Sequence, residues 1–200
     1  MGSFLILYGT GEGQTAKVST RLADAIKSRG HDVTTRDVED VSEGFSVSEF
    51  DAVLVGSSIH AGRHHRGIRT FITEHRADLQ NRPTALFQVS LSSAEEDPER
   101  RAEAASYVDD LLEETDWSPD RIGLFGGALR YSKYGFLKRL VMKQIAGRKK
   151  GNVDTSRDYE YTDWEEVSAF GNDFVAFVEG RLGLTSATAT SEEQHEDRPR

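Results

Sequence analysis

Short apolar runs alternate along the chain with longer segments in which apolar residues recur every three or four positions. The short runs are typical of buried β-strands, and the longer period is typical of helices with one buried face. Strands are predicted at 4–8, 31–38, 52–56, 83–89 and 121–129. Helices are predicted at 14–29, 65–75, 98–114 and 162–180, and Thr162 with Glu165 forms a predicted capping box before the last one.

This alternation of strands and helices predicts an α/β fold, with a parallel sheet that is covered by helices on both faces. Five strands fit the doubly wound order 2-1-3-4-5, with an insertion around 130–160 before the last helix. We expect residues 1–182 to form a single domain. Residues 183–200 lack apolar periodicity, and the segment is rich in Ser, Thr and Ala from Thr185 onward and then charged, so we expect a disordered acidic tail.

Ligands of doubly wound sheets bind outside the carboxyl ends of the strands. The first loop at this edge reads Gly9-Thr10-Gly11-Glu12-Gly13-Gln14-Thr15-Ala16 and leads from a strand into a helix. A helix N-terminus offers free N–H groups and attracts phosphate. The loop is neither a Walker loop nor a Gly-x-Gly-x-x-Gly motif. The alternative is a tight strand-to-helix turn that needs glycine for its geometry alone.

Two further loops follow strands at the same edge. The segment 56–66 contains Arg63, His64, His65 and Arg66, which favours an anionic substrate. No carboxylate is interleaved in 57–69, so we predict no metal site there. The alternative is a solvated cationic helix start. The segment 89–94 is rich in Ser, whose hydroxyls can hydrogen-bond a ring edge, although such turns are also common without a ligand.

Composition indicates the cellular compartment and the salt environment of the protein. The chain has no cysteine, which excludes disulfides and thiolate metal sites and fits a cytoplasmic protein. It has no apolar run of the ~20 residues that a membrane-spanning helix needs. Its net charge of −9 with few lysines favours a halophilic protein, whose acidic surface aids solubility in concentrated salt. The alternative is an ordinary acidic cytoplasmic protein.

Basic residues are concentrated in 130–150, which carries eight Lys and Arg residues and no Asp or Glu. Apolar residues in this segment fall on one helical face, and a basic amphipathic helix is typical of peripheral membrane contact. The alternatives are a helix that packs on its own domain and an interface with a second subunit, which would make the protein a homo-oligomer. Nucleic acid is not an expected partner, because the rest of the chain is strongly acidic.

The first loop resembles the phosphate loop of the flavodoxin superfamily, Thr/Ser-x-Thr-Gly-x-Thr, with Glu12 in place of the middle Thr. The closer resemblance, over roughly residues 4–178, is to the flavodoxin-like, quinone-dependent protoporphyrinogen IX dehydrogenases, in which position 12 is also acidic. It extends to Gly56-Ser57-Ser58-Ile59-His60 and to two specific blocks, Gly126-Gly127-Ala128-Leu129-Arg130-Tyr131 and Tyr161-Thr162-Asp163-Trp164-Glu165. Ala61 departs from the family, which often has an aromatic residue there.

The resemblance implies a flavodoxin-like fold, non-covalent FMN, and oxidation of protoporphyrinogen IX to protoporphyrin IX in haem biosynthesis, with a membrane quinone as acceptor. The FMN-binding residues that it suggests are Thr10, Gly11, Glu12, Gly13, Gln14, Thr15, Ala16, Ser57, Ser58, Ile59, His60, Val89, Ser90, Leu91 and Ser92. The candidate contacts to the propionates of a porphyrinogen are Arg63, His64, Arg66, Arg130 and Lys133. The alternatives are a flavodoxin-type electron carrier and an NAD(P)H:quinone reductase.

Overall fold

The computed structural model describes residues 1–42, 44–94, 97–129 and 159–184. Five parallel strands form the central sheet: β1 (Ser3–Gly9), β2 (Asp32–Asp37), β3 (Ala52–His60), β5 (Thr84–Ser90) and β6 (Arg121–Gly126). Their spatial order is β2-β1-β3-β5-β6, which is the predicted order 2-1-3-4-5 when the parallel strands are counted along the chain. A short strand, β4 (Arg63–His64), pairs antiparallel with the end of β3.

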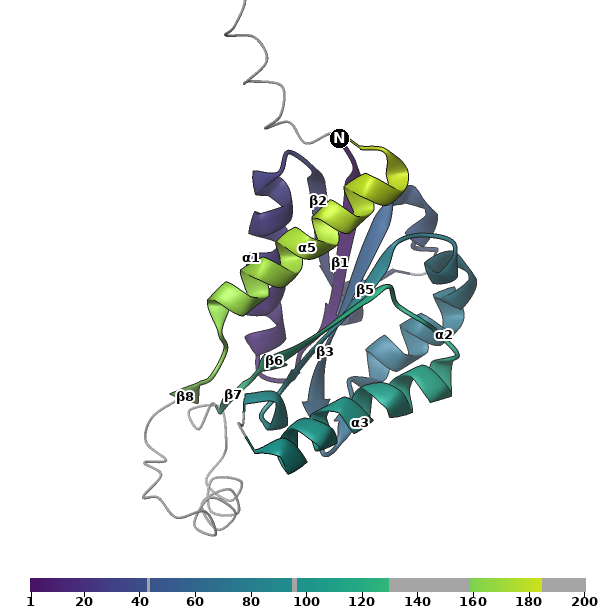
Figure 1. Cartoon of the computed structure of the whole chain (residues 1–200). Helices are drawn as coiled ribbons and strands as arrows, with labels where there is room; N and C mark the ends of the chain where they lie inside the picture. Colours follow the sequence, from purple (N-terminus) through teal and green to yellow (C-terminus); the bar gives the residue numbers. More distant parts are fainter. Residues whose placement is uncertain (43, 95–96, 130–158, 185–200) are drawn as a thin grey trace, which may run out of the picture.

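Helices cover both faces of the sheet (Figure 1). On one face lie α1 (Gln14–Ser28) and α5 (Trp164–Leu182), and on the other lie α2 (Arg66–Gln80) and α3 (Pro98–Thr115). The described residues also include the 3-10 helices η1 (Val38–Asp40), η2 (Val47–Glu49) and η3 (Ser92–Ala94).

The continuous apolar run of β1 is explained by this double cover. Phe4 and Ile6 enter the core beneath α1 and α5, whereas Leu5 and Leu7 enter the core beneath α2. All four side chains are fully buried. A strand with both faces buried has no polar alternation, as is typical of parallel sheets.

Two local predictions were wrong. The segment predicted as one strand at 121–129 is β6 followed by β7 (Ala128–Leu129), which pairs with β8 (Tyr159–Glu160) in a separate two-stranded sheet. The last helix has Asp163 as its N-cap, and its Oδ1 accepts hydrogen bonds from the backbone N–H groups of Glu165 and Glu166 at 2.9 and 3.1 Å. The predicted capping box at Thr162 is therefore replaced by an Asp cap one residue later.

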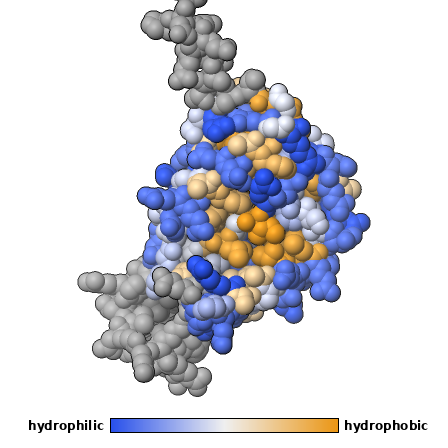
Figure 2. All heavy atoms as spheres, viewed as in Figure 1, coloured by the Kyte–Doolittle hydropathy of each residue, from blue (hydrophilic) through white to orange (hydrophobic). Residues whose placement is uncertain are grey.

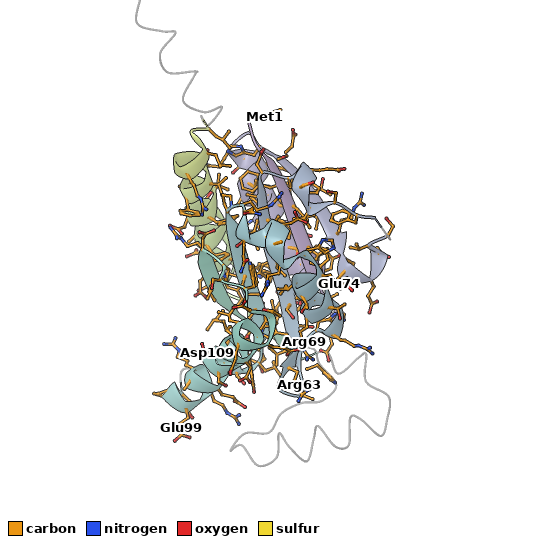
Figure 3. The ribbon with its side chains drawn as sticks, turned by 90° about the vertical axis from the view of Figure 1, so that its right-hand side faces the viewer. Met1, Arg63, Arg69, Glu74, Glu99 and Asp109 are labelled. Atoms are coloured by element: carbon orange, nitrogen blue, oxygen red, sulfur yellow. The ribbon has the colours of Figure 1, made fainter. Side chains whose placement is uncertain are left out.

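The basic segment 130–150 and most of the predicted tail lie outside the described residues. Over the part of the chain that the structure describes, no helix is long and apolar enough to cross a membrane. Polar side chains cover most of the face seen in Figure 2, and apolar residues gather near its centre. Arg63 and Arg69 lie at the end of the molecule opposite Met1, which is the end where the parallel strands finish (Figure 3).

The hairpin formed by β3 and β4 packs against α3, and a buried histidine of β4 lies in this contact region. His64 is 5% exposed, and neither of its ring nitrogens has a hydrogen-bond partner among the described residues. The pKa of His64 is lowered to about 4, chiefly by burial and also by the charge of Arg69, while the Tyr107 carbonyl, Asp110 and Gln88 act in the opposite direction. The side chain is therefore neutral at neutral pH.

This burial predicts an acid-labile hairpin. Because the folded pKa lies below the ordinary value of 6.5, the unfolded chain binds the proton more readily, so stability is full above pH 6.5 and falls as the pH drops towards 4. At about 1.4 kcal/mol per pKa unit, the loss is of the order of 3 kcal/mol. Urea unfolding of the parent and of His64→Gln at several pH values between 7 and 4 measures it. We expect the free energy of unfolding to fall less in the variant than in the parent. Equal falls would show that His64 is not the source of the acid lability.

Candidate functional site

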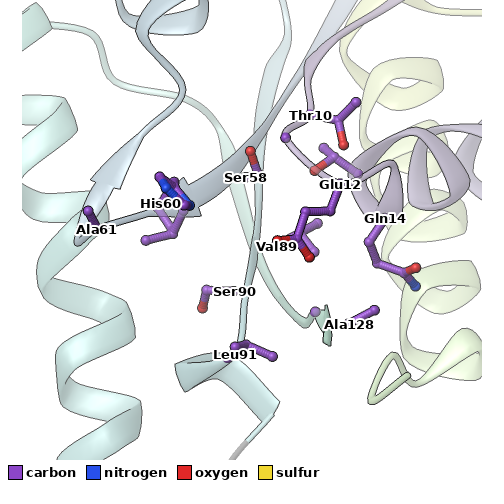
Figure 4. A pocket seen from close by; sticks show the side chains of 14 residues that line it. Thr10, Glu12, Gln14, Ser58, His60, Ala61, Val89, Ser90, Leu91 and Ala128 are labelled. Carbon is purple, nitrogen blue, oxygen red and sulfur yellow. The ribbon is translucent and has the colours of Figure 1, made fainter. Parts of the chain in front are cut away.

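A cavity of about 270 Å³ lies at the carboxyl ends of the central strands. Four segments line it: the loop after β1, the end of β3, the end of β5, and the residues after β6. The lining residues are Thr10, Gly11, Glu12, Gln14, Thr15, Ser58, Ile59, His60, Ala61, Val89, Ser90, Leu91, Gly127 and Ala128. Figure 4 shows His60 and Ala61 on one side of this space and Glu12 and Gln14 on the other. We call it the strand-end pocket.

The loop after β1 gives one wall of the pocket an uncapped helix start. Gly13 is the N-cap of α1, with a φ of 90° that favours glycine, and it supplies no side-chain cap. The Thr10 hydroxyl accepts a hydrogen bond from the Gly13 N–H at 2.8 Å and so fixes the turn. Thr15 Oγ1 is buried and has no partner among the described residues. An unpartnered buried hydroxyl beside a helix N-terminus suits a phosphate group.

The opposite wall is the β3–β4 hairpin. Its two turn residues, Ala61 and Gly62, have φ values of 50° and 76°. Both lie in the left-handed region, which is the pattern of the type I′ turn that commonly joins antiparallel strands. For Ala this conformation costs roughly 1–2 kcal/mol, so the surrounding contacts must hold the turn in place. Ala61 lines the pocket directly.

The third wall joins residues from two segments that the sequence singled out, 126–131 and 161–165. The Gly127 N–H donates to the Ser90 carbonyl at 2.9 Å, and the Thr162 hydroxyl donates to the Gly126 carbonyl at 2.6 Å. A Cβ atom on Gly126 would lie 2.3 Å from the Tyr161 carbonyl oxygen, so glycine is needed for this approach. Gln14 Nε2 then donates to Thr162 Oγ1 at 2.8 Å. Residues 126–127 and 161–162 therefore meet at the start of α1.

Most of the residues that the sequence suggested for cofactor binding line the strand-end pocket. Gly13, Ala16, Ser57 and Ser92 do not line it. Of these, Ser57 Oγ accepts from the His65 N–H at 2.9 Å, and Ser92 Oγ donates to Glu103 Oε2 at 3.0 Å, so both support the walls from behind. The cofactor residues suggested by the sequence omitted Gly127 and Ala128, which belong to the block 126–131, and Ala61, which was noted only as a departure from the family.

The predicted cationic cluster is not brought together around this pocket. Arg63 is exposed next to the hairpin turn and faces a second cavity with Arg69, Tyr107 and Glu114. The expectation that His64 is a cationic substrate contact was wrong, because that side chain is buried and neutral. Arg66 borders a groove with Thr70 and Glu74, away from the pocket lining. Arg130 and Lys133 lie outside the described residues.

Comparison with known structures supports the fold. A short-chain flavodoxin associated with a bacterial microcompartment aligns with a TM-score of 0.55 and 12% identity, covering 89% of this chain and 99% of that chain. A flavodoxin from the domain Archaea aligns with a TM-score of 0.52 and 16% identity, covering 88% and 99% of the two chains. At these identities the likeness concerns the fold alone.

Comparison of sequences is more specific. Residues 5–156 match the family described as flavodoxin domain. The chain is 33% identical over 170 residues to protoporphyrinogen IX dehydrogenase (quinone) of Escherichia coli strain K12, covering 84% of this chain and 92% of that protein. It is 32% identical over 178 residues to the protein of the same name from Leishmania major, covering 86% and 74%. The chain therefore belongs to the flavodoxin family, among the relatives of the quinone-dependent protoporphyrinogen IX dehydrogenases.

Proposed function

We propose that this protein is an FMN-dependent enzyme that oxidises protoporphyrinogen IX to protoporphyrin IX and passes the electrons to a quinone. The observation that carries the proposal is the Thr15 hydroxyl at the uncapped start of α1, which is buried inside a pocket at the strand ends and has no hydrogen-bond partner among the described residues. It occurs in a chain that is one-third identical to two enzymes of that name across most of its length.

The lining residues divide the pocket between the two ends of an FMN molecule. We assign Thr10, Thr15 and the first N–H groups of α1 to the phosphate, because they combine hydroxyl donors with the positive end of a helix dipole. The ring system then lies between the hairpin residues 58–61 and the segment 89–91. When bound, FMN supplies the redox chemistry by accepting an electron pair from the substrate and donating it to the acceptor.

The protein's own task is to bind and orient the substrate against the flavin. A porphyrinogen carries propionate carboxylates, and a planar guanidinium pairs well with a carboxylate. Arg63 is the exposed arginine next to the hairpin turn that bounds the pocket. We therefore assign one propionate to Arg63. Arg130 and Lys133 remain further candidates from the sequence.

Transfer of electrons to a membrane quinone requires contact with the membrane. We propose that the basic segment 130–150 makes this contact peripherally, with each Lys or Arg near an anionic surface contributing about 1 kcal/mol. Flotation with anionic vesicles tests the proposal, using a variant in which Lys138, Arg139, Lys143, Lys149 and Lys150 are changed to Gln. The parent should float at low salt and the variant should not. Equal flotation would favour the alternative of a subunit interface.

The phosphate assignment makes a prediction for Thr15. Thr15→Val keeps the shape and removes the hydroxyl, so FMN should bind about tenfold more weakly. Thr15→Glu places a carboxylate against the phosphate and should weaken binding about a hundredfold or more. Quenching of flavin fluorescence on titration of the apoprotein measures both constants. Thr20→Val is the matched control, because Thr20 lies on the same helix, is exposed and donates to its own helix at the Ala16 carbonyl. Unchanged FMN affinity in both Thr15 variants would show that the phosphate does not bind at Thr15.

The substrate assignment makes a prediction for Arg63. Arg63→Gln should raise the KM for protoporphyrinogen IX about fivefold, since an exposed ion pair contributes up to ~1 kcal/mol, while the flavin content stays the same. Arg66→Gln is the control, because Arg66 is a neighbouring exposed arginine that lies on α2 beside Thr70 and Glu74, whereas Arg63 adjoins the hairpin turn and pairs with His60 of the pocket lining. A KM that rises equally in both variants, or in neither, would show that Arg63 does not contact the substrate.

A further inference from the structure

Two walls of the strand-end pocket both contact the same turn of helix α3. One wall is the β3–β4 hairpin, and the other is the segment after β5 that includes η3. Glu103 and Tyr107 lie one helical turn apart on α3. Each contacts one of these walls, and neither lines the pocket.

Glu103 binds the segment after β5. Its Oε2 accepts hydrogen bonds from Ser92 Oγ at 3.0 Å and from Arg100 Nη1 at 2.8 Å, and its Oε1 accepts one from the Tyr107 hydroxyl at 2.7 Å. The hydrogen bond from Arg100, followed by that from Tyr107, lowers the pKa of Glu103. The carboxylate is therefore ionised at neutral pH, and its hydrogen bonds are charge-assisted.

Tyr107 contacts the hairpin. A Cβ atom on Gly62 would lie 3.7 Å from a carbon of the Tyr107 ring, so the ring packs directly beneath the hairpin turn. Tyr107 and the buried His64 also line the second cavity together, beside Gly62. One residue of α3 thus faces both the turn and the strand β4 that follows it.

The hairpin turn is strained, so it needs contacts that hold it in place. Ala61 holds a left-handed conformation that its side chain disfavours, and it lines the pocket. In the segment after β5, Ser90 also lines the pocket, and its hydroxyl accepts from the Ser93 N–H at 3.1 Å. A fixed distance between two such walls needs a common support that touches both.

We infer that Glu103 and Tyr107 are positioning residues for the flavin ring, because together they set the separation of the two walls between which the ring is proposed to lie. The link runs from Ser92 through Glu103 and Tyr107 to Gly62 and His64. The inference rests on the proposed binding of FMN in the strand-end pocket. Neither residue lines that pocket, so their effect on FMN acts through the walls.

Two conservative variants test the link. Glu103→Gln keeps the shape of the side chain and removes its charge, and Tyr107→Phe removes one hydroxyl. Each should weaken FMN binding about tenfold, as expected for loss of a charge-assisted hydrogen bond at a partly buried site. The double variant should have the same FMN affinity as whichever single variant binds FMN more weakly, because both changes break the same link. Ser92→Ala breaks it from the loop side and should have the same effect.

Glu114→Gln is the matched control. Glu114 is another α3 carboxylate with an arginine partner, Arg69, but that partner belongs to α2 and not to a wall of the pocket. The control should retain parental FMN affinity. At saturating FMN, the visible circular dichroism of the bound flavin should change in Glu103→Gln and not in Glu114→Gln. Urea unfolding of each apoprotein shows that the variants are folded.

The outcomes separate this inference from the proposed function. If the parent binds no FMN, the proposed function fails and the inference fails with it. If the parent binds FMN but Glu103→Gln, Tyr107→Phe and Ser92→Ala all bind it within twofold of the parent, only the inference is overturned. An equal loss of affinity in Glu114→Gln would also overturn it, because the effect would then be a general one of helix α3.

Discussion

Burial of the central strands on both faces is the constraint on which the rest of the structure depends. Alternate residues of β1 enter two different cores, one beneath α1 and α5 and one beneath α2. Such a strand needs a helical cover on each side, and a helix between successive strands makes those strands parallel. All carboxyl ends then lie at one edge of the sheet. The loop between β1 and α1, the β3–β4 hairpin and the segment after β5 therefore meet at this edge.

The pocket is completed by contacts between segments far apart in the sequence. Gly126 admits the Tyr161 carbonyl where any Cβ atom would collide, and Thr162 connects that point to Gln14 at the start of α1. On the opposite side, the strained turn at Ala61 and Gly62 is held against α3 by His64 and Tyr107. The walls of the site are thus supported by residues outside the pocket itself, and their geometry follows from the way the helices pack.

The sequence predicted what depends on local pattern and missed what depends on long-range packing. The five parallel strands and the glycine-rich loop at 9–16 were predicted because apolar runs and glycine spacing are local signals. The hairpin at β4 was missed, since a two-residue strand has no period. His64 was expected on the surface among Arg63, His65 and Arg66, and only the packing of α3 against β4 explains its burial. The cap at Asp163 was placed one residue early for the same reason, because Thr162 is engaged by Gly126 instead.

The most direct test of the account is anaerobic turnover by the purified, FMN-loaded protein. Protoporphyrinogen IX with a menaquinone analogue is compared with NADPH or NADH and the same quinone, and the appearance of protoporphyrin IX fluorescence and the reduction of quinone are followed together. The account predicts quinone-dependent formation of protoporphyrin IX and no comparable quinone reduction with either nicotinamide. Rapid quinone reduction by NADPH or NADH without oxidation of the porphyrinogen would contradict it.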